Sequence, residues 1–166
     1  MSRVTDYLSD RDVAFQVLPH ARALTSVEEA RALGVAADEV VKTVALLGRG
    51  GYVLAVVPAS WRLDLRLARD LLDDPTVRLA SEGELLVDFP GYELGALPPL
   101  GSLLGVRMLV DPRVLEHEVV IIAGGIETES VSATVAELFR DEPFQVAALT
   151  GEHDPNAGEP VAKPGR

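Results

Sequence analysis

The period of hydrophobic positions changes along the chain, and each change predicts an element of secondary structure. Residues 40–59, VVKTVALLGRGGYVLAVVPA, hold two apolar runs rich in β-branched residues, separated by GRGG. Such runs are typical of strands, and glycines supply the positive φ angles that a tight turn requires. The segment therefore predicts a β-hairpin. In residues 64–74, DLRLARDLLDD, apolar residues recur at helical spacing, which predicts an amphipathic helix.

Capping residues and prolines predict where further elements begin and end. Residues 25–34, TSVEEARALG, begin with Thr25 or Ser26 as an N-cap and end with Gly34 as a C-cap, which predicts a helix. In chain order, the other expected elements are a helix over 4–10, strands over 14–20 and 76–80, a capped helix over 81–89, strands over 106–111 and 117–125, and a strand that continues into a helix over 129–141. This irregular alternation predicts an α+β fold around a mixed sheet.

Composition predicts one domain followed by a tail. Residues 1–150 contain no internal repeat and no long linker rich in proline and glycine, so we expect a single domain there. Residues 151–166, GEHDPNAGEPVAKPGR, hold few large apolar side chains. We expect them to form a flexible acidic tail, because burial could not offset the entropy of ordering them.

Charge and hydropathy exclude several classes of protein. The chain has 26 acidic and 15 basic residues and a net charge of -11, which opposes broad contact with a polyanion, so we expect no DNA partner and only local contact with any RNA. No apolar run approaches the roughly 20 residues that span a bilayer, and we expect no membrane partner. The polar N-terminus and the absence of cysteine predict a cytoplasmic protein.

Lys42 is the one charged side chain within the apolar run over 40–47. Strand periodicity places it on the same face as Val40 and Val44. One interpretation is that the ammonium reaches water along its alkyl stem. The other is that it forms a compact positive charge at the floor of a pocket, suited to a phosphate or a developing oxyanion.

Two glycine-containing segments are further candidates for a site. The loop over 91–101, GYELGALPPLG, is stiffened by Pro98 and Pro99 and could form a rigid lip with exposed backbone groups, although it could equally serve only to connect a helix to a strand. Gly124 and Gly125 follow an apolar strand and could turn their amides toward an anion. They lack the GxGxxG spacing of a dinucleotide site.

Other chemistries find no support in the sequence. The histidines His20, His117 and His153 are far apart, and without cysteines they show no metal-ligand spacing, so we predict no metal site. There is no GxSxG elbow, and GRGG lacks the lysine of a phosphate-binding P-loop. We therefore expect no cofactor and no serine hydrolase.

The order of several segments resembles a known family. These segments are LPHARALTSVEEARALGV, EVVKTVALL, YVLAVVPASWRLDL, VRLASEGEL, FPGYELGALPPLG and VVIIAGG, and together they cover nearly all of residues 10–141. In this order they resemble the YbaK-like domain that is related to the editing insertion of bacterial prolyl-tRNA synthetases. VVKTV followed by a GALPPLG-type loop is the most specific part of the resemblance.

The resemblance implies a fold and an activity. The implied fold is a mixed, partly barrel-like sheet with flanking helices. The implied activity is trans-acting hydrolysis of the ester of a mischarged aminoacyl-tRNA, with the acceptor end of that tRNA as a partner and an aminoacyl-tRNA synthetase as a second one. An aminoacyl ester is already activated, so backbone amides and one lysine could position a water and stabilise the oxyanion without a side-chain nucleophile.

The same resemblance implies roles for individual residues. Lys42 would contact the 3'-terminal phosphate or hold the reacting end, and the loop from Gly95 would contact the aminoacyl group, so we predict Lys42 and Gly95 as catalytic. The predicted substrate-binding residues are His20, Thr43, Pro98, Pro99, Gly101, Gly124 and Gly125. For His20 a structural role is an equal alternative.

One departure from the family pattern keeps other functions open. Many relatives place a histidine after the last AG-type turn, whereas here the segment GGIETES offers Glu127, Thr128, Glu129 and Ser130. A non-catalytic module that binds a tRNA end or a synthetase is therefore an alternative to a deacylase. A domain that binds a small ligand in the same pocket is another.

Overall fold

The structure, a computed structural model, describes residues 2–157. In chain order the elements are α1 (Arg3–Asp10), β1 (Gln16–Pro19), α2 (Ser26–Leu33), the 3-10 helix η1 (Ala37–Glu39), β2 (Val41–Gly48), β3 (Gly51–Pro58), β4 (Trp61–Leu63), α3 (Leu65–Leu72), β5 (Arg78–Leu79), α4 (Glu82–Asp88), α5 (Gly101–Leu104), β6 (Arg107–Val110), α6 (Pro112–Leu115), β7 (Val119–Ile126), β8 (Glu129–Thr134), α7 (Val135–Leu138), β9 (Gln145–Val146), β10 (Thr150–His153) and the 3-10 helix η2 (Pro155–Ala157).

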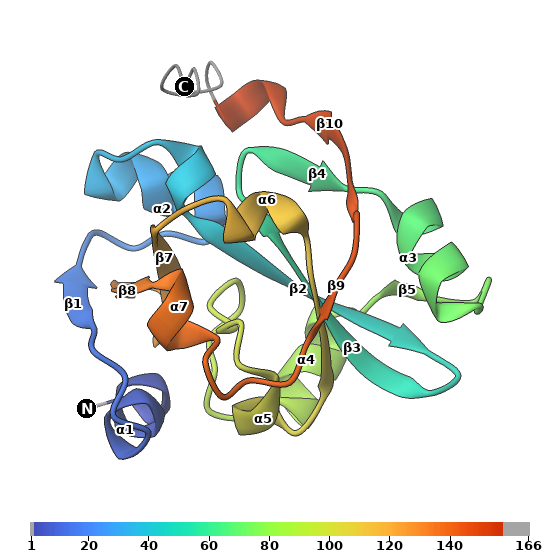
Figure 1. Cartoon of the computed structure of the whole chain (residues 1–166), viewed down its shortest axis with the longest axis horizontal. Helices are drawn as coiled ribbons and strands as arrows, with labels where there is room; N and C mark the ends of the chain where they lie inside the picture. The colour runs from blue at the N-terminus through green and yellow to red at the C-terminus, as the bar shows by residue number, and fades with distance from the viewer. Residues whose placement is uncertain (1, 158–166) are drawn as a thin grey trace.

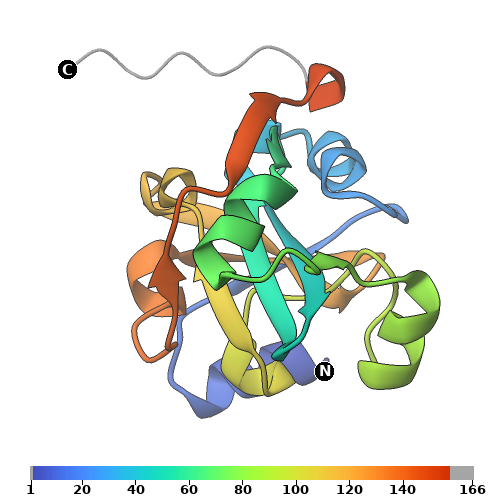
Figure 2. The same cartoon turned by 90° about the vertical axis from the view of Figure 1, so that its right-hand side faces the viewer.

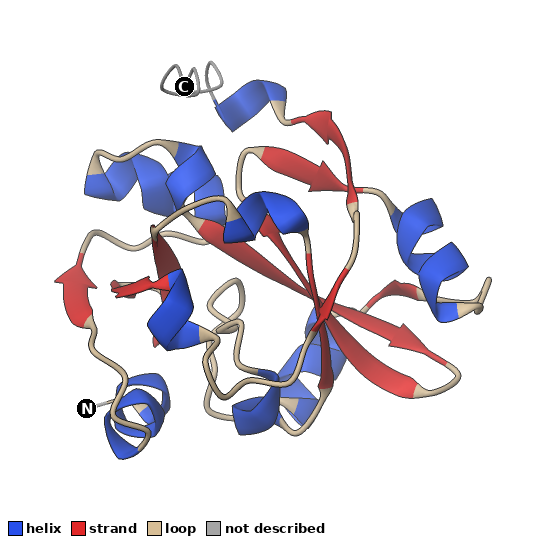
Figure 3. Ribbon diagram, viewed as in Figure 1, coloured by secondary structure: helices blue, strands red, loops and turns tan. Residues whose placement is uncertain are grey.

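The strands form one larger and two smaller sheets. The five-stranded sheet has the order β5-β2-β3-β6-β9, with β2 and β3 antiparallel and β6 parallel to β3. The order β1-β8-β7 makes a second sheet and β10-β4 a third. Helices flank these strands on the outside (Figure 1, Figure 3). The expected α+β fold with a mixed sheet is confirmed, but over residues 2–157 the strands do not close into a barrel.

The five-stranded sheet and the three-stranded sheet join at one point and share a core. Val40, directly before β2, forms a parallel bridge with Ile121 of β7. One face of the joined sheets carries the main core, to which β2 and β3 contribute Val41, Ala45, Leu54 and Val56.

The opposite face carries two smaller clusters. One lies beneath α3 and contains Leu46, Val57 and Ala68. The other lies beneath α2 and contains Ala30 and Val40. In Figure 2, α3 stands in front of the β2–β3 hairpin. The side chain of Lys42 therefore projects from a face of β2 that is apolar both before and after this residue.

The strongest local signals in the sequence predict the observed elements. The β2–β3 hairpin turns at Gly48–Gly51, and Gly51 takes the positive φ of 98° that only glycine adopts easily. Helix α2 begins where the Thr25 hydroxyl accepts a hydrogen bond from the Glu28 amide, and it ends at Gly34 with a φ of 67°. The predicted hairpin and capped helix are both confirmed.

The end of the chain differs from the expectation of a tail that begins at residue 151. Strand β10 pairs with β4, and the Asp154 amide donates to the Ser60 carbonyl at 2.7 Å. Backbone hydrogen bonds hold this polar segment in place, and a hydropathy argument does not register such bonds. Residues 151–157 therefore belong to the folded domain, and the rest of the expected tail lies outside the described residues.

Candidate functional site

A small pocket contains two of the predicted site residues, His20 and Gly95. Its space of about 10 Å³ suffices for roughly one water molecule. The lining residues are His20, Ala23, Glu29, Gly95, Ala96, Ala123, Ile126, Glu127 and Glu129. They come from the end of β1, from α2, from the loop after α4 and from the β7–β8 hairpin. The fold therefore brings two distant segments of the predicted site together.

Gly95 is held at the pocket by its backbone. Its φ is 78°, and a Cβ at this position would lie 2.2 Å from the carbonyl oxygen of Leu24. The same loop is tied to β7, because the Glu93 amide donates to the Gly125 carbonyl at 2.9 Å. In the view of Figure 1 this loop runs between the β7–β8 pair and the β2–β3 hairpin. Close approach of two backbones explains why glycine stands here.

His20 is anchored by its backbone and by both ring nitrogens. Its amide donates to the Thr128 carbonyl at 3.0 Å. Nδ1 lies 2.7 Å from the carbonyl oxygen of Ala21, and Nε2 lies 2.7 Å from the hydroxyl of Ser130. The imidazole is therefore fixed over the segment that follows the β7–β8 turn, where this chain has no histidine of its own.

A buried carboxyl lies behind the imidazole. Glu29 on α2 is only 5% exposed, and its carboxyl is hydrogen-bonded to the Ser130 hydroxyl, which is completely buried. Burial raises the pKa of Glu29 above its ordinary value of 4.5, while the bond from Ser130 and the nearby His20 oppose that rise.

Sequence reasoning missed Glu29 and its pairing with Ser130, and it named Ser130 only as part of the segment without the family histidine. The available signal was helical spacing. Ser26, Glu29, Ala30 and Leu33 follow the i, i+3, i+4, i+7 pattern of a core-facing stripe, so Glu29 occupies a position that normally carries an apolar residue.

Lys42 is half-buried and bonded to the backbone of a neighbouring strand. Its Nζ donates to the Trp61 carbonyl at 3.2 Å. Burial lowers the pKa of Lys42, Asp154 acts in the opposite direction, and Arg62 adds to the lowering. Lys42 does not lie in open solvent at the end of an extended stem. It is also not among the residues that line the pocket of His20 and Gly95.

The topology nevertheless places Lys42 and this pocket on the same face of the joined sheets. Val40 and Ile121 form the parallel bridge and pack in the same cluster beneath α2. Lys42 and Ala123 each lie two residues further along their strands, and side chains two apart share a face. Ala123 lines the pocket. Lys42 and the pocket therefore face the same side of the joined sheets.

Thr43 lies on the other face of β2. It pairs with Val56 of the main core, and its hydroxyl oxygen is buried without a hydrogen-bond partner among residues 2–157. An unpaired buried hydroxyl costs free energy. The predicted contact of Thr43 with a substrate stays a prediction.

The remaining predicted residues shape the backbone around the site. Pro98 and Pro99 are buried, and a Cβ on Gly101 at the start of α5 would lie 2.7 Å from the Val106 carbonyl oxygen. Gly124 and Gly125 lie where the β7–β8 register shifts, and Gly125 has a φ of 90°. These features account for the glycines structurally, and the binding roles predicted for them stay predictions.

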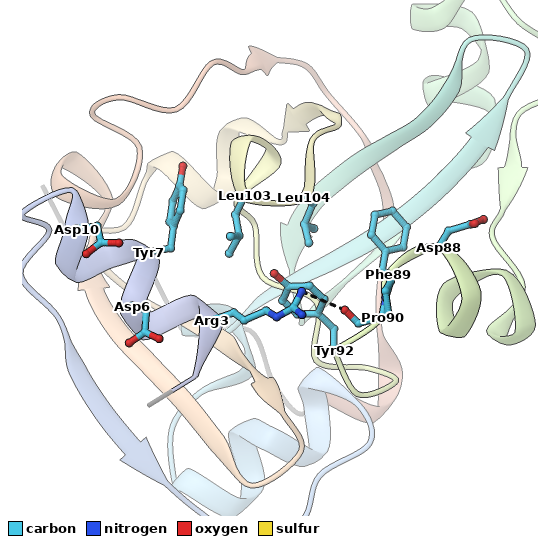
Figure 4. A pocket seen from close by; sticks show the side chains of 10 residues that line it. All are labelled: Arg3, Asp6, Tyr7, Asp10, Asp88, Phe89, Pro90, Tyr92, Leu103 and Leu104. Carbon is cyan, nitrogen blue, oxygen red and sulfur yellow. Dashed lines mark hydrogen bonds between the residues drawn. The ribbon is translucent and has the colours of Figure 1, made fainter.

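A larger cavity of about 400 Å³ lies between α1, the end of α4 and α5. Figure 4 shows its lining, in which Arg3 extends toward Tyr92 and donates to the Pro90 carbonyl at 3.3 Å. The lining residues are Arg3, Asp6, Tyr7, Asp10, Asp88, Phe89, Pro90, Tyr92, Leu103 and Leu104. None of the predicted site residues lines this cavity.

Two further features are absent from the described part of the chain. Among residues 2–157, no three His, Asp or Glu side chains are grouped as metal ligands. No helix within those residues has the length and apolar character needed to cross a bilayer.

Comparison with known proteins decides the family. The profile of the Aminoacyl-tRNA editing domain matches residues 20–140, a range that includes the pocket and Lys42. The chain belongs to the aminoacyl-tRNA editing domain family. This assignment confirms the YbaK-like, prolyl-tRNA synthetase-associated family that the order of sequence segments resembles.

Curated relatives of this editing domain are proline–tRNA ligases. The enzyme of Fervidobacterium nodosum is 31% identical over 133 residues, which cover 79% of this chain and 23% of the ligase. The enzyme of Thermosipho melanesiensis is 30% identical over 157 residues, which cover 92% of this chain and 27% of the ligase. The chain spans about a quarter of the length of the curated relatives it matches.

Solved structures share the fold of the editing domain. One, described as a candidate trans-editing enzyme for prolyl tRNA synthetase, superposes with a TM-score of 0.77 at 30% identity and covers 90% of this chain and 96% of its own. Another, of a protein described only as hypothetical, has a TM-score of 0.80 at 28% identity and covers 90% of this chain and 100% of its own.

Proposed function

We propose that this editing domain hydrolyses the ester bond of a mischarged aminoacyl-tRNA, acting in trans. The observation that supports it best is the meeting of His20 and Gly95 at one pocket, with Lys42 on the same face of the sheets. The relatives point to the same chemistry, since one solved structure is described as a candidate trans-editing enzyme for prolyl tRNA synthetase. Because the curated relatives are proline–tRNA ligases, we take tRNA for proline as the tRNA partner.

In the proposed reaction a water molecule adds to the carbonyl carbon of the ester. The carbonyl oxygen becomes an oxyanion, and the bond to the 3'-terminal ribose oxygen then breaks, with a proton passing from the water to that oxygen. Gly95 and its loop offer backbone groups to the aminoacyl end. A rigid loop places such groups without further ordering cost at the moment of reaction.

Lys42 supplies the positive charge of the proposed site. Its ammonium has three hydrogen-bond donors, of which the Trp61 carbonyl takes one, so two remain for a phosphate or an oxyanion. Partial burial strengthens such a contact, because charges interact more strongly where water is excluded. The acidic net charge of the protein is compatible with this arrangement if only the acceptor end enters.

The small pocket gives the proposed activity its selectivity. Space for about one water favours a small side chain on the mischarged amino acid and excludes a larger one. Alanine carried by tRNA for proline is therefore the first substrate to test.

A non-catalytic module that binds a tRNA end or a synthetase is the second candidate. It is favoured by the contacts that both ring nitrogens of His20 and the ammonium of Lys42 already make within the protein. Such groups would hold an end in place without reacting with it.

The two candidates are separated by pairing turnover with binding. The purified protein is mixed with tRNA for proline charged with alanine, serine or proline, and the loss of the aminoacyl group is followed in parallel with binding of the tRNA. If the protein is a deacylase, it should hydrolyse the alanine ester well above the rate in buffer. Binding without such hydrolysis for any of the three esters would instead support the module.

A further inference from the structure

A carboxyl, a hydroxyl and an imidazole form an unbroken chain of hydrogen bonds from the interior to the pocket. The Glu29 carboxyl on α2 is bonded to the Ser130 hydroxyl on β8, and that hydroxyl lies 2.7 Å from Nε2 of His20. Glu29 is 5% exposed and Ser130 is fully buried, whereas His20 is only partly buried, and both Glu29 and His20 are among the residues that line the pocket. This series of hydrogen bonds therefore starts at a buried carboxyl and ends at the partly exposed imidazole of the candidate site.

The partners at each end determine where the protons can lie. The Ala21 carbonyl 2.7 Å from Nδ1 of His20 can only accept, so Nδ1 carries a hydrogen. The Ser130 hydroxyl has one hydrogen to donate and can accept as well. Each bond in this series therefore needs one donor, and with one proton shared between Glu29 and Nε2 of His20 two arrangements satisfy all of them.

In the first arrangement Glu29 is protonated and donates to Ser130, which donates to the neutral imidazole. In the second, His20 is protonated at Nε2 and donates to Ser130, which donates to the Glu29 carboxylate. The two differ only by one proton that has moved along Ser130 from Glu29 to His20. If that proton were absent, two lone pairs would face each other between Nε2 and Ser130, which is unfavourable at 2.7 Å.

We propose that Glu29 and Ser130 are positioning residues that share one proton with His20 and thereby allow the imidazole over the pocket to become positively charged on demand. The total charge of the three groups is the same in both arrangements. An anion that enters the pocket favours the second arrangement, because it draws the positive charge toward itself. The chemical class of this ligand is the oxyanion of a carbonyl group, because a pocket with space for about one water does not hold a phosphate.

Other charged groups around the imidazole do not form part of this chain. Glu127 and Glu129 line the same pocket, and Glu127 is paired with Arg22. Neither carboxylate is hydrogen-bonded to His20 or Ser130 in the described residues. Glu29 is therefore the one of these three carboxyl groups that is connected to His20 by hydrogen bonds in the described residues.

The test that needs no activity is a pH titration of the His20 ring by nitrogen-15 NMR. In the wild-type protein the neutral ring is expected to carry its hydrogen on Nδ1. Glu29→Gln keeps the hydrogen bonds but removes the charge, and it is expected to weaken proton binding by the His20 ring about tenfold. Ser130→Ala breaks the link and is expected to weaken proton binding by the ring as well.

Glu28→Gln is the matched control, since Glu28 is the neighbouring residue on α2 and is exposed. An unchanged titration of His20 in Glu29→Gln, or the same change in Glu28→Gln, would overturn the shared proton. Circular dichroism of each variant identifies one that fails to fold, and Ser130→Ala then decides in place of Glu29→Gln.

The role of this shared proton in catalysis rests on the proposed function and is tested by a separate measurement. The pH profile of deacylation by Glu29→Gln is expected to shift in the same direction as the nitrogen-15 titration curve of that variant. A shifted NMR titration with an unshifted profile removes the relay from the reaction but leaves the shared proton in place. Absence of deacylation in the wild type would overturn the proposed function alone, because the NMR titration is read without substrate.

Discussion

The α-carbon of Gly95 packs against the carbonyl oxygen of Leu24, so closely that a Cβ on this residue would lie 2.2 Å from that oxygen. Leu24 stands directly before the Thr25 cap of α2, and Gly95 belongs to the loop that lines the pocket. The position of the loop relative to α2, and hence to His20, therefore depends on the absence of a single side chain.

Replacing Gly95 with alanine is expected to displace the loop. The new Cβ would meet backbone, which cannot rotate away as a side chain can, and alanine is also strained at a φ of 78°. We expect deacylation to fall by about 100-fold, since a displacement on the order of 1 Å can have that effect. Unfolding in urea should show a loss of about 1–3 kcal/mol.

Gly50→Ala is the control for this substitution, because a Cβ at Gly50 in the β2–β3 turn would meet nothing within 4 Å. It should retain activity. Wild-type rates in Gly95→Ala would mean that the loop does not position the aminoacyl group.

A substitution at Thr43 is expected to stabilise the protein, whereas Gly95→Ala is expected to destabilise it. Its buried hydroxyl oxygen has no partner in the described residues, so Thr43→Val should raise the free energy of unfolding by about 1 kcal/mol. Thr43→Ser keeps the hydroxyl and should not gain stability. If Thr43 also binds the substrate as predicted from the sequence, the valine variant should show a higher KM. A valine variant less stable than the wild type would indicate that the hydroxyl does have a partner.

The buried carboxyl of Glu29 should make stability depend on pH in a defined direction. Its pKa in the folded protein is raised above 4.5, so its neutral form favours folding. This contribution is fully present below about pH 4.5 and is lost as pH rises through the folded pKa. The stability that Glu29→Gln gains over the wild type should therefore increase as pH rises above about 4.5.

The measurement is urea unfolding of both proteins at several pH values, with Glu28→Gln as the matched change of charge on α2. A difference between Glu29→Gln and the wild type that stays constant with pH would contradict the raised pKa.

Asp154 should tune the charge of Lys42. Burial lowers the pKa of Lys42 and Asp154 partly restores it, so Asp154→Asn should lower that pKa further. If the ammonium form is the active one, the variant should lose deacylation at a lower pH than the wild type on the alkaline side. Glu152→Gln removes a charge from the same segment and should leave the profile in place. If the alkaline limbs of the two pH profiles were identical in Asp154→Asn and the wild type, Asp154 would have no influence on the ionisation of Lys42 that matters for the reaction.

The sequence predicts much of the fold because its main signals are local. Caps such as Thr25 and Gly34 and the glycines of the β2–β3 turn act within a few residues, and they appear where expected. Strand β10 was not predicted, because TGEH has no apolar pattern and is held by pairing with β4 from far along the chain. Pairing between distant segments leaves little trace in local composition.

For the candidate site too, the local features could be predicted from the sequence and the contacts between distant segments could not. The face on which Lys42 lies follows from strand period, and Gly95 could be singled out as a residue that tolerates close approach. The link from Glu29 through Ser130 to His20 joins three segments far apart in sequence, so no local pattern reveals it. The buried glutamate on the core-facing stripe of α2 was the one available sign.

The most direct measurement of the central claim compares Lys42→Met with the wild type. Methionine keeps an unbranched side chain of similar length in the half-buried position but carries no charge. The rate of hydrolysis of alanyl-tRNA for proline is measured under single-turnover conditions at saturating protein. We expect the wild type to hydrolyse it and Lys42→Met to be slower by about 100-fold, in line with the loss of one oxyanion-stabilising group. Equal rates in the two proteins, both above that in buffer, would contradict the role of Lys42 and with it the proposed active site.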